Sequence, residues 1–110
     1  MTPTVINTPY FVPIQSLPLQ QELYGGEIYE YYPLGHYIVS APQICGGRPT
    51  FKYTRLEVTI VLTLLAQGQN IEQLLGEYAD SQLTRPALQE AIFLACSALV
   101  QSTQTLPLAA

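Results

Sequence analysis

The residues of this chain whose types could carry chemistry are concentrated in one short segment. It begins with Cys45-Gly46-Gly47-Arg48-Pro49, and no Lys or Arg precedes it. Three of the four basic residues of the chain lie within it, namely Arg48, Lys52 and Arg55. Cations beside a Gly-Gly turn can contact phosphate, because the amides of such a turn can also form an anion-binding nest. The first hypothesis is therefore a DNA or anion contact made by these three side chains.

The alternative interpretation of the same arginines is structural. An Arg beside a Gly-Gly turn can pair with a carboxylate and hold the sheet against the helices, and the candidate carboxylates are Glu57, Glu77 and Asp80. Short Gly-rich motifs often match by chance, so this interpretation is preferred for Arg48 and Arg55. Lys52 lies between two aromatic residues and is predicted to point to solvent.

The sequence holds few residues for catalysis or metal binding. His36 is the only histidine, and with Cys45 it is the only pair that could supply a base and a thiol nucleophile. A buried or capping histidine and an inert thiol account for these residues better. The spacings of Cys45 and Cys96 from His36 and from each other do not match a zinc-binding motif, which disfavours a zinc site. We predict no catalytic residue, no metal, no cofactor and no enzyme activity.

An acidic and aromatic stretch lies before the basic segment. Glu27 and Glu30 are three residues apart, so on one strand they would point to opposite faces and would not share a metal. Four tyrosines accompany them, at positions 29, 31, 32 and 37. Tyrosines can stack on bases, but no Lys or Arg is near them in sequence. Packing against the N-terminal arm or a partner is the preferred interpretation.

Composition limits the function classes. A length of 110 residues allows one domain with one core. The apolar content of 48% with only 11% charged residues favours an oligomer or an apolar arm. The net charge of −4 argues against general nucleic-acid binding. The longest apolar run, Val58 to Ala66, is too short for a membrane span. Without a leader-like start, a cytoplasmic location with reduced cysteines is expected.

Hydrophobic patterning places the elements that must position these residues. Residues 1–26 contain four prolines and are predicted to form an extended arm. Residues 27–40 are rich in strand formers, interrupted by Pro33-Leu34-Gly35, which predicts a β-hairpin, and residues 50–53 are a candidate third strand. A single domain is expected over residues 27–101, followed by a tail at 102–110.

Three helices follow, which completes an α+β fold. The first has a possible capping box at Thr54 and Glu57 and ends near Gly68, the second is capped by Asn70, and the third by Thr84. The third helix is predicted to bury one stripe, made of Leu88, Ala91, Ile92, Ala95 and Leu99.

The rest of the third helix suggests an interface more than a DNA-reading surface. Phe93, Leu94 and Val100 lie off the predicted buried stripe, so the helix is apolar nearly all round and these three are the predicted subunit interface. Only Arg85 and Gln89 near its start have side chains suited to base contacts.

Several short motifs in order resemble domain-of-unknown-function family 433, a small bacterial and archaeal family. The resemblance covers roughly residues 36–101, and its most specific part is Gly46-Gly47-Arg48-Pro49 followed by Thr54-Arg55. The other matching segments are Tyr37-Ile38-Val39, Leu64-Leu65-Ala66-Gln67-Gly68, Ile71-Glu72-Gln73-Leu74-Leu75, Tyr78, Leu83-Thr84 and Ala91. The resemblance implies a homeodomain-like helix-turn-helix and an antitoxin-like role beside PIN-like nuclease toxins.

The chain departs from the family pattern in three places. The family usually has Gly immediately before Thr-Arg, whereas this chain has Tyr53, which disfavours a positive φ there. The turn Ala79–Leu83 is longer than is typical. The third helix opens with Thr84-Arg85-Pro86-Ala87, with less charge than usual, which weakens the implied DNA contact.

We therefore expect a small antiparallel β element followed by a three-helix, homeodomain-like helix-turn-helix bundle. The expected function is that of a non-enzymatic, antitoxin-like homodimer that binds a protein partner, such as a PIN-like toxin, and contacts DNA weakly. The alternative is a structural or protein-interaction module without DNA binding. Convergence of Arg48, Arg55 and Arg85 on one face would favour DNA, whereas buried pairing with carboxylates would favour the module.

Overall fold

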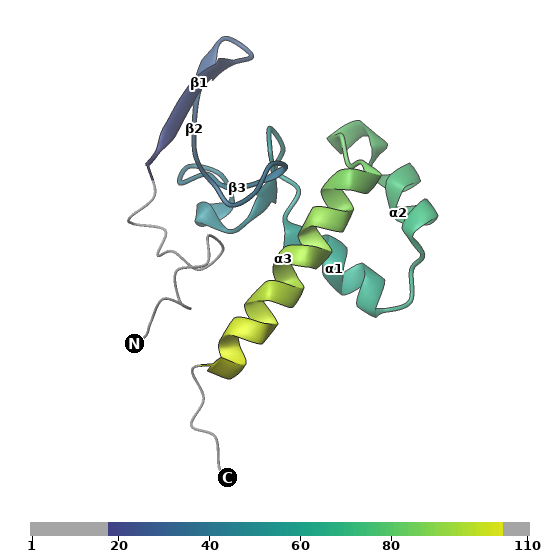
Figure 1. Cartoon of the computed structure of the whole chain (residues 1–110). Helices are drawn as coiled ribbons and strands as arrows, with labels where there is room; N and C mark the ends of the chain where they lie inside the picture. Colours follow the sequence, from purple (N-terminus) through teal and green to yellow (C-terminus); the bar gives the residue numbers. More distant parts are fainter. Residues whose placement is uncertain (1–17, 105–110) are drawn as a thin grey trace.

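A four-stranded antiparallel sheet precedes three helices in the computed structural model, which describes residues 18–104 (Figure 1). The strands lie in the order β1-β2-β3-β4, so each strand pairs with its neighbours in the chain. Their bounds are β1 Gln20–Tyr24, β2 Glu27–Pro33, β3 Ile38–Ser40 and β4 Thr50–Phe51. The helices are α1 Val58–Ala66, α2 Ile71–Glu77 and α3 Arg85–Gln104, with 3-10 turns η4 Cys45–Gly47 and η5 Ala79–Ser81. The prediction of an α+β fold is confirmed.

Strand β1 lies in the segment for which the sequence predicts only an extended arm. It pairs with β2 from Gln20 opposite Tyr31 to Tyr24 opposite Glu27. Gly25 and Gly26 join the two strands, both with positive φ, which glycine adopts without a steric penalty. Residues 20–24 have a weak strand pattern of their own, so cross-strand contacts with β2 decide their conformation. Residues 1–17 of the predicted arm lie outside the described residues.

The sheet and helices are joined where the chain leaves β4. The amide of Val58 donates to the Pro49 carbonyl at 3.0 Å, and the amide of Phe51 donates to the Leu56 carbonyl at 3.1 Å. Helix α1 consequently begins at Val58 with Glu57 as its N-cap. The predicted capping box is wrong, because the Thr54 hydroxyl donates to the Phe51 carbonyl and accepts from the Leu56 amide.

The other helix ends follow the sequence signals. Gly68, with φ of 102°, follows the C-cap of α1. Asn70 and Gln73 form a reciprocal capping box at the start of α2. The Thr84 hydroxyl accepts from the amide of Ala87 at 3.3 Å in the first turn of α3. No helix within residues 18–104 is long and apolar enough to cross a bilayer.

The main core lies between the helices and the β3–β4 half of the sheet. Val61 of α1, Leu74 of α2 and Leu88 of α3 are almost fully buried there against Ile38 and Phe51. A second, smaller core forms under the hairpin from Tyr29, Tyr31, Val39 and Ala41.

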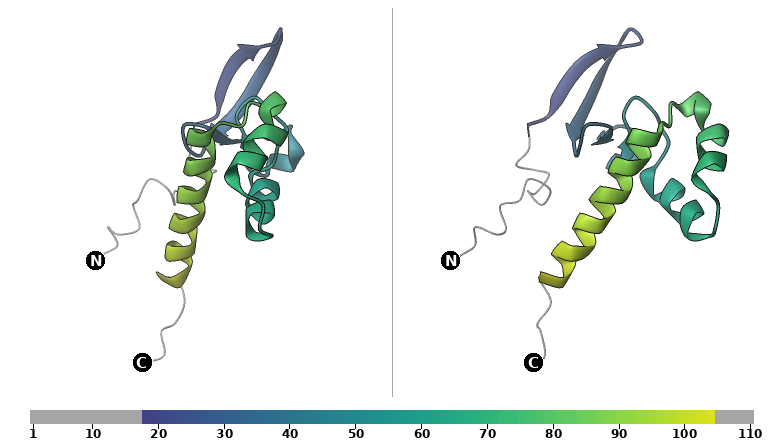
Figure 2. Two further views of the ribbon diagram at one scale, coloured as in Figure 1. Left: turned by 90° about the vertical axis from the view of Figure 1, so that its right-hand side faces the viewer. Right: turned by 45° about the vertical axis from the view of Figure 1, so that its right-hand side comes forward.

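Helix α3 buries only the first part of its predicted stripe. Leu88 and Ala91 are buried as expected, whereas Ile92, Ala95 and Leu99 are exposed, so the prediction is wrong for these three. The 20-residue helix extends past α1 and the sheet, and its C-terminal half projects at the end of the molecule opposite the β1–β2 hairpin (Figures 1 and 2). Burial therefore stops where the neighbouring elements end.

Glu90 links α3 to the turn between β2 and β3. Its carboxylate accepts the backbone amides of His36 at 2.8 Å and Tyr37 at 2.7 Å. A Cβ at Gly35 would lie 2.5 Å from one Glu90 oxygen, so glycine is the residue that leaves room for this contact. The position of α3 on the sheet thus depends on a carboxylate and a glycine 55 residues apart in the chain.

We expect Glu90→Ala to lower the free energy of unfolding by about 1.5 kcal/mol, because two amides lose a charged acceptor. Gly35→Ala should cost a similar amount in the natural chain, because its methyl group displaces the carboxylate. In the Glu90→Ala background, Gly35→Ala should cost less than about 0.5 kcal/mol. Urea denaturation of the four proteins measures this coupling, and strictly additive effects would contradict the proposed contact.

Candidate functional site

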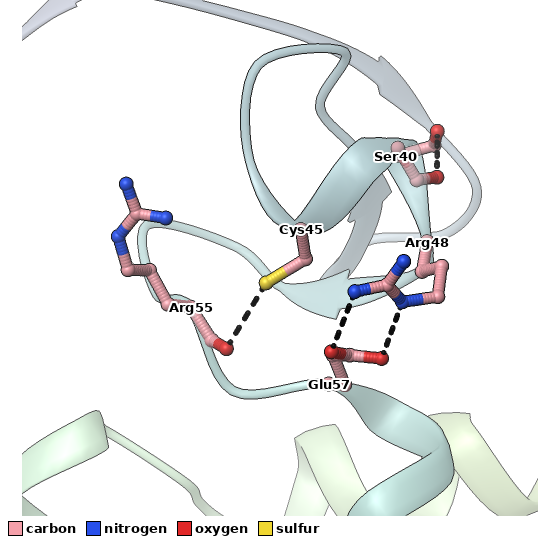
Figure 3. A network of polar contacts seen from close by, with 6 residues as sticks. Ser40, Cys45, Arg48, Arg55 and Glu57 are labelled. Atoms are coloured by element: carbon pink, nitrogen blue, oxygen red, sulfur yellow. Dashed lines mark hydrogen bonds and ion pairs between the residues drawn. The ribbon is translucent and has the colours of Figure 1, made fainter.

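Arg48 pairs with a carboxylate instead of presenting a free cation. Its guanidinium contacts both oxygens of Glu57, at 2.9 and 3.2 Å (Figure 3). The hydrogen bond to Arg48 lowers the pKa of Glu57 below its ordinary value, and the same bond raises the pKa of Arg48. The Arg48 side chain is 63% exposed and that of Glu57 19%. Glu57 is one of the three carboxylates that the sequence offered as partners for Arg48. The pair is only partly buried.

The Gly-Gly turn does not present an open anion nest. Cys45, Gly46 and Gly47 all have positive φ, and the turn is closed by its own backbone. The amide of Gly47 donates to the Ile44 carbonyl, and the amide of Arg48 donates to the Cys45 carbonyl. The Ser40 hydroxyl donates to the Gly47 carbonyl at 2.6 Å (Figure 3). Two of the amides that a nest would use are therefore occupied.

Lys52 packs into the hairpin, so the prediction that it points to solvent is wrong. Its ammonium lies 3.3 Å from a Glu22 oxygen and 4.6 and 5.0 Å from the ring centroids of Tyr31 and Tyr53. Burial by itself would lower the pKa of Lys52, but hydrogen bonds with Tyr31, Tyr53 and Glu22 outweigh burial and raise it. The sequence pattern did not predict this contact, because Lys52 is more than 20 residues from Tyr31 in the chain.

Tyr53 adopts a left-handed conformation, with φ of 68°. The sequence-based expectation that tyrosine disfavours a positive φ here is wrong for this chain. The ring stacks on Tyr24 at a centroid distance of 4.4 Å, and the hydroxyl donates to Glu22 at 2.5 Å. The amide of Tyr53 donates to the Tyr29 hydroxyl at 3.0 Å. These contacts offset the backbone strain of a non-glycine residue in this region.

Glu22 is the common acceptor of this cluster. The hydroxyls of Tyr31 and Tyr53 both donate to its carboxylate, each at 2.5 Å, and Lys52 lies beside it. These hydroxyl bonds lower the pKa of Glu22, and the Glu22 bond raises the pKa of Tyr53. Burial raises the pKa of Tyr29. Tyr29 and Tyr31 therefore pack against Tyr24 and Glu22 of β1, which belongs to the predicted arm, so the preferred interpretation is confirmed for these two tyrosines.

The remaining predicted contact residues are Arg55, Arg85 and Gln89, and of the two arginines only Arg85 is paired within residues 18–104. Arg85 pairs with Glu72, and Gln89 is exposed on the first turns of α3. Arg55 is exposed and forms no ion pair with any residue between 18 and 104. Its carbonyl accepts the thiol of Cys45 at 3.4 Å, and its guanidinium points away from Arg48 (Figure 3). Arg48 and Arg85 are each paired with a carboxylate and Arg55 points away from Arg48, so the three arginines do not present a shared surface of free cations.

An open cleft of about 510 Å³ lies where Arg55 meets the hairpin. Tyr24, Tyr29 and Tyr53 supply its aromatic lining, and Arg55, Glu27 and Glu30 also line it. These residues lie in separate segments of the sequence, and only the folding of the 53–55 turn against the hairpin brings them together.

His36 and Cys45 do not form a nucleophile pair. His36 is exposed and its ring packs edge-on against Tyr37, whereas the Cys45 thiol is bonded to the Arg55 carbonyl. Among residues 18–104, no three His, Cys, Asp or Glu side chains group as metal ligands would.

The predicted interface residues differ in exposure. Phe93 is 51% and Val100 59% exposed, whereas Leu94 is partly buried and packs against the core of its own chain. The expectation that Leu94 lies away from the buried face is thus wrong. A continuous exposed stripe instead combines Ile92, Ala95, Cys96 and Leu99.

A family model described as "Protein of unknown function (DUF433)" matches residues 38–95, which is just over half of the chain. The match begins at β3 and ends within α3, so the β1–β2 hairpin precedes it. No curated protein and no solved structure matches the chain.

We expect acidification to loosen the hairpin through protonation of Glu22. Since its folded pKa is lowered, its stabilising contribution is complete above about pH 4.5, the ordinary value, and is lost as the pH falls through the lowered folded pKa. Amide hydrogen exchange at Leu23 and Ile28 should accelerate below that pH, after correction for intrinsic exchange. Glu22→Gln should remove this pH dependence, whereas Glu27→Gln, which changes a neighbouring exposed carboxylate, should preserve it. An unchanged pH profile in Glu22→Gln would contradict the assignment.

Proposed function

Because the chain belongs to the DUF433 family, we propose that it is a non-enzymatic, antitoxin-like helix-turn-helix protein that acts as a homodimer. Its main activity is binding a protein partner in the cytoplasm, with a PIN-like toxin as the proposed partner class. Contact with DNA is weak and secondary. In this proposal α2, the turn at η5 and α3 correspond to the helix-turn-helix unit.

The observation that carries the proposal is the exposed apolar stripe of α3. Ile92, Ala95, Cys96 and Leu99 follow the i, i+3, i+4, i+7 spacing of a helix face that is normally buried. Leu99 is 68% and Ile92 37% exposed. Such a stripe on a projecting helix is typical of a surface covered in an assembly, and a two-fold dimer is the commonest closed assembly.

The cations favour protein binding over DNA binding. Arg48, Lys52 and Arg85 each contact a carboxylate of the same chain, so a phosphate would have to displace that partner. With a net charge of −4, little electrostatic attraction to DNA remains. Arg85 and Gln89 are the exposed polar residues at the start of α3 that support the weak contact. The pairing equally supports the alternative, an interaction module without DNA binding.

We expect the protein to sediment at twice the mass of one chain at micromolar concentration, and Leu99→Glu to dissociate it. Burying this leucine contributes about 1.5 kcal/mol in each subunit, so its loss from two subunits should weaken self-association about 100-fold. Leu23→Glu is a matched control, because Leu23 of β1 is 76% exposed but lies on the hairpin. Analytical ultracentrifugation tests the prediction, and a monomeric natural chain would contradict it.

We expect DNA binding only at low ionic strength, with the chain's own promoter region as the probe. Arg85→Ala should reduce the slope of log K against log salt by about 2 in a dimer, since each lost phosphate contact contributes about 0.9. Glu72→Gln should strengthen binding, because it removes the carboxylate that holds Arg85. Fluorescence anisotropy across a salt series measures both effects. Tight binding at physiological salt that persists in Arg85→Ala would locate the DNA contact elsewhere, and no binding at low salt would favour the alternative module.

A further inference from the structure

The cleft beside the hairpin has an unpaired strand edge as one wall. Strand β2 pairs with β1 along Glu27–Tyr31, but it pairs with β3 only at Tyr32 and Pro33. On the side away from β1, residues 27–31 pair with no strand of the described chain. A strand presents backbone amides and carbonyls on both edges, so this edge can pair with a further strand.

The opposite wall is formed by the 43–44 loop and the 53–55 turn. Gln43, Ile44, Tyr53, Thr54 and Arg55 line the cleft from that side, facing Glu27–Glu30 of β2. The cleft of about 510 Å³ is open to solvent. We call this cleft between the free edge of β2 and residues 53–55 the tyrosine groove. Its position is that of an added strand in β-augmentation, where main-chain bonds give affinity and side-chain pockets give specificity.

Charges on the two walls indicate what the groove accepts. Arg55 is the one cation of the described chain without an ion pair, and it lies on the turn side. Glu27 and Glu30 lie on the strand side. A nucleic-acid strand would bring phosphates against these carboxylates, which disfavours it. A peptide can place one acidic side chain at Arg55 and leave the strand side to neutral or basic residues.

The aromatic wall is held rigidly before any ligand arrives. Tyr53 is fixed by its stack on Tyr24, its hydroxyl bond to Glu22 and its amide bond to Tyr29. A strained backbone that its surroundings hold in place is typical of a binding site, and a preorganised site loses less entropy on binding. The hairpin that supplies Tyr24 and Tyr29 also lies outside the segment matched by the family model.

We propose that the tyrosine groove binds an extended segment of a protein partner, which adds as a strand to the free edge of β2 and places an acidic side chain on Arg55. This inference rests on the proposed function in one respect, namely that the main ligand of the chain is a protein. It assigns recognition to the hairpin, whereas the dimer surface lies on α3. The β1–β2 hairpin and the C-terminal half of α3 lie at opposite ends of the molecule (Figures 1 and 2).

Selection of a random decapeptide display library on the full chain tests the proposal. Enriched peptides should share an Asp or Glu, alternating apolar positions and no central proline. A synthetic copy should bind at least about tenfold more weakly to Arg55→Glu, because a bidentate charged contact is replaced by repulsion. Arg85→Glu changes an exposed arginine that does not line the groove, so it is the matched control and should bind normally. Circular dichroism would verify that both variants remain folded.

Pairing between the peptide backbone and β2 can be tested separately from the charge contact at Arg55. N-methylation of the peptide at successive amides should abolish binding at every second position, since alternate amides face β2. Leu99→Glu should leave peptide binding unchanged, so failure of the dimer proposal and failure of the groove proposal are separable. No enriched peptide, full binding to Arg55→Glu, absence of the two-residue period, or loss of binding in Leu99→Glu would each overturn the proposal. Groove binding of a ten-nucleotide oligo-dT, lost in Arg55→Glu, would also overturn it by assigning the groove to nucleic acid.

Discussion

Two backbone amides in the β2–β3 turn need an acceptor, and the Glu90 carboxylate of α3 supplies it. This contact places the first half of α3 on the sheet, where Leu88 and Ala91 complete the core. A Cβ at residue 35 would displace this carboxylate, so glycine at this position leaves room for the contact. Among residues 18–104 the core packs on the first half of α3, and the remaining turns of the helix extend beyond these neighbouring elements (Figure 2). The exposed apolar stripe is thus a consequence of where the helix is attached.

The basic segment that dominates the sequence serves mainly to connect the two halves of the fold. Arg48 holds Glu57, the N-cap of α1, while the closed turn at Cys45–Gly47 directs the chain into β4. Exposed ion pairs contribute little to stability on average, so backbone bonds between residues 49–51 and 56–58 provide most of the connection. The Arg55 side chain has no ion pair among residues 18–104 and is the cation left for a ligand.

The two ends of the molecule therefore carry different surfaces. One end has the apolar stripe of α3, suited to a second copy of the chain because it is uncharged and helical. The other has the tyrosine groove, which combines hydrogen-bonding backbone with both signs of charge. A dimer formed through α3 would leave both grooves accessible, so a symmetric assembly could hold two partner segments at once.

The sequence alone determined that strands precede helices in an α+β fold, and it located the helix ends at Gly68 and Asn70. The basic motif also identified the family. These features depend on residues close together in the chain. It could not determine β1, the Lys52 contacts or the grouping of Tyr24, Tyr53 and Arg55. The Lys52 contacts with Glu22 and Tyr31 and the Tyr24–Tyr53 stack join residues more than 20 positions apart, which local periodicity does not record. Strand β1 pairs with the adjacent β2, but its own residues carry only a weak strand pattern. Tertiary structure also decided which part of the α3 stripe is buried. Periodicity identifies an apolar face, but only the length of the neighbouring elements decides how much of that face they cover.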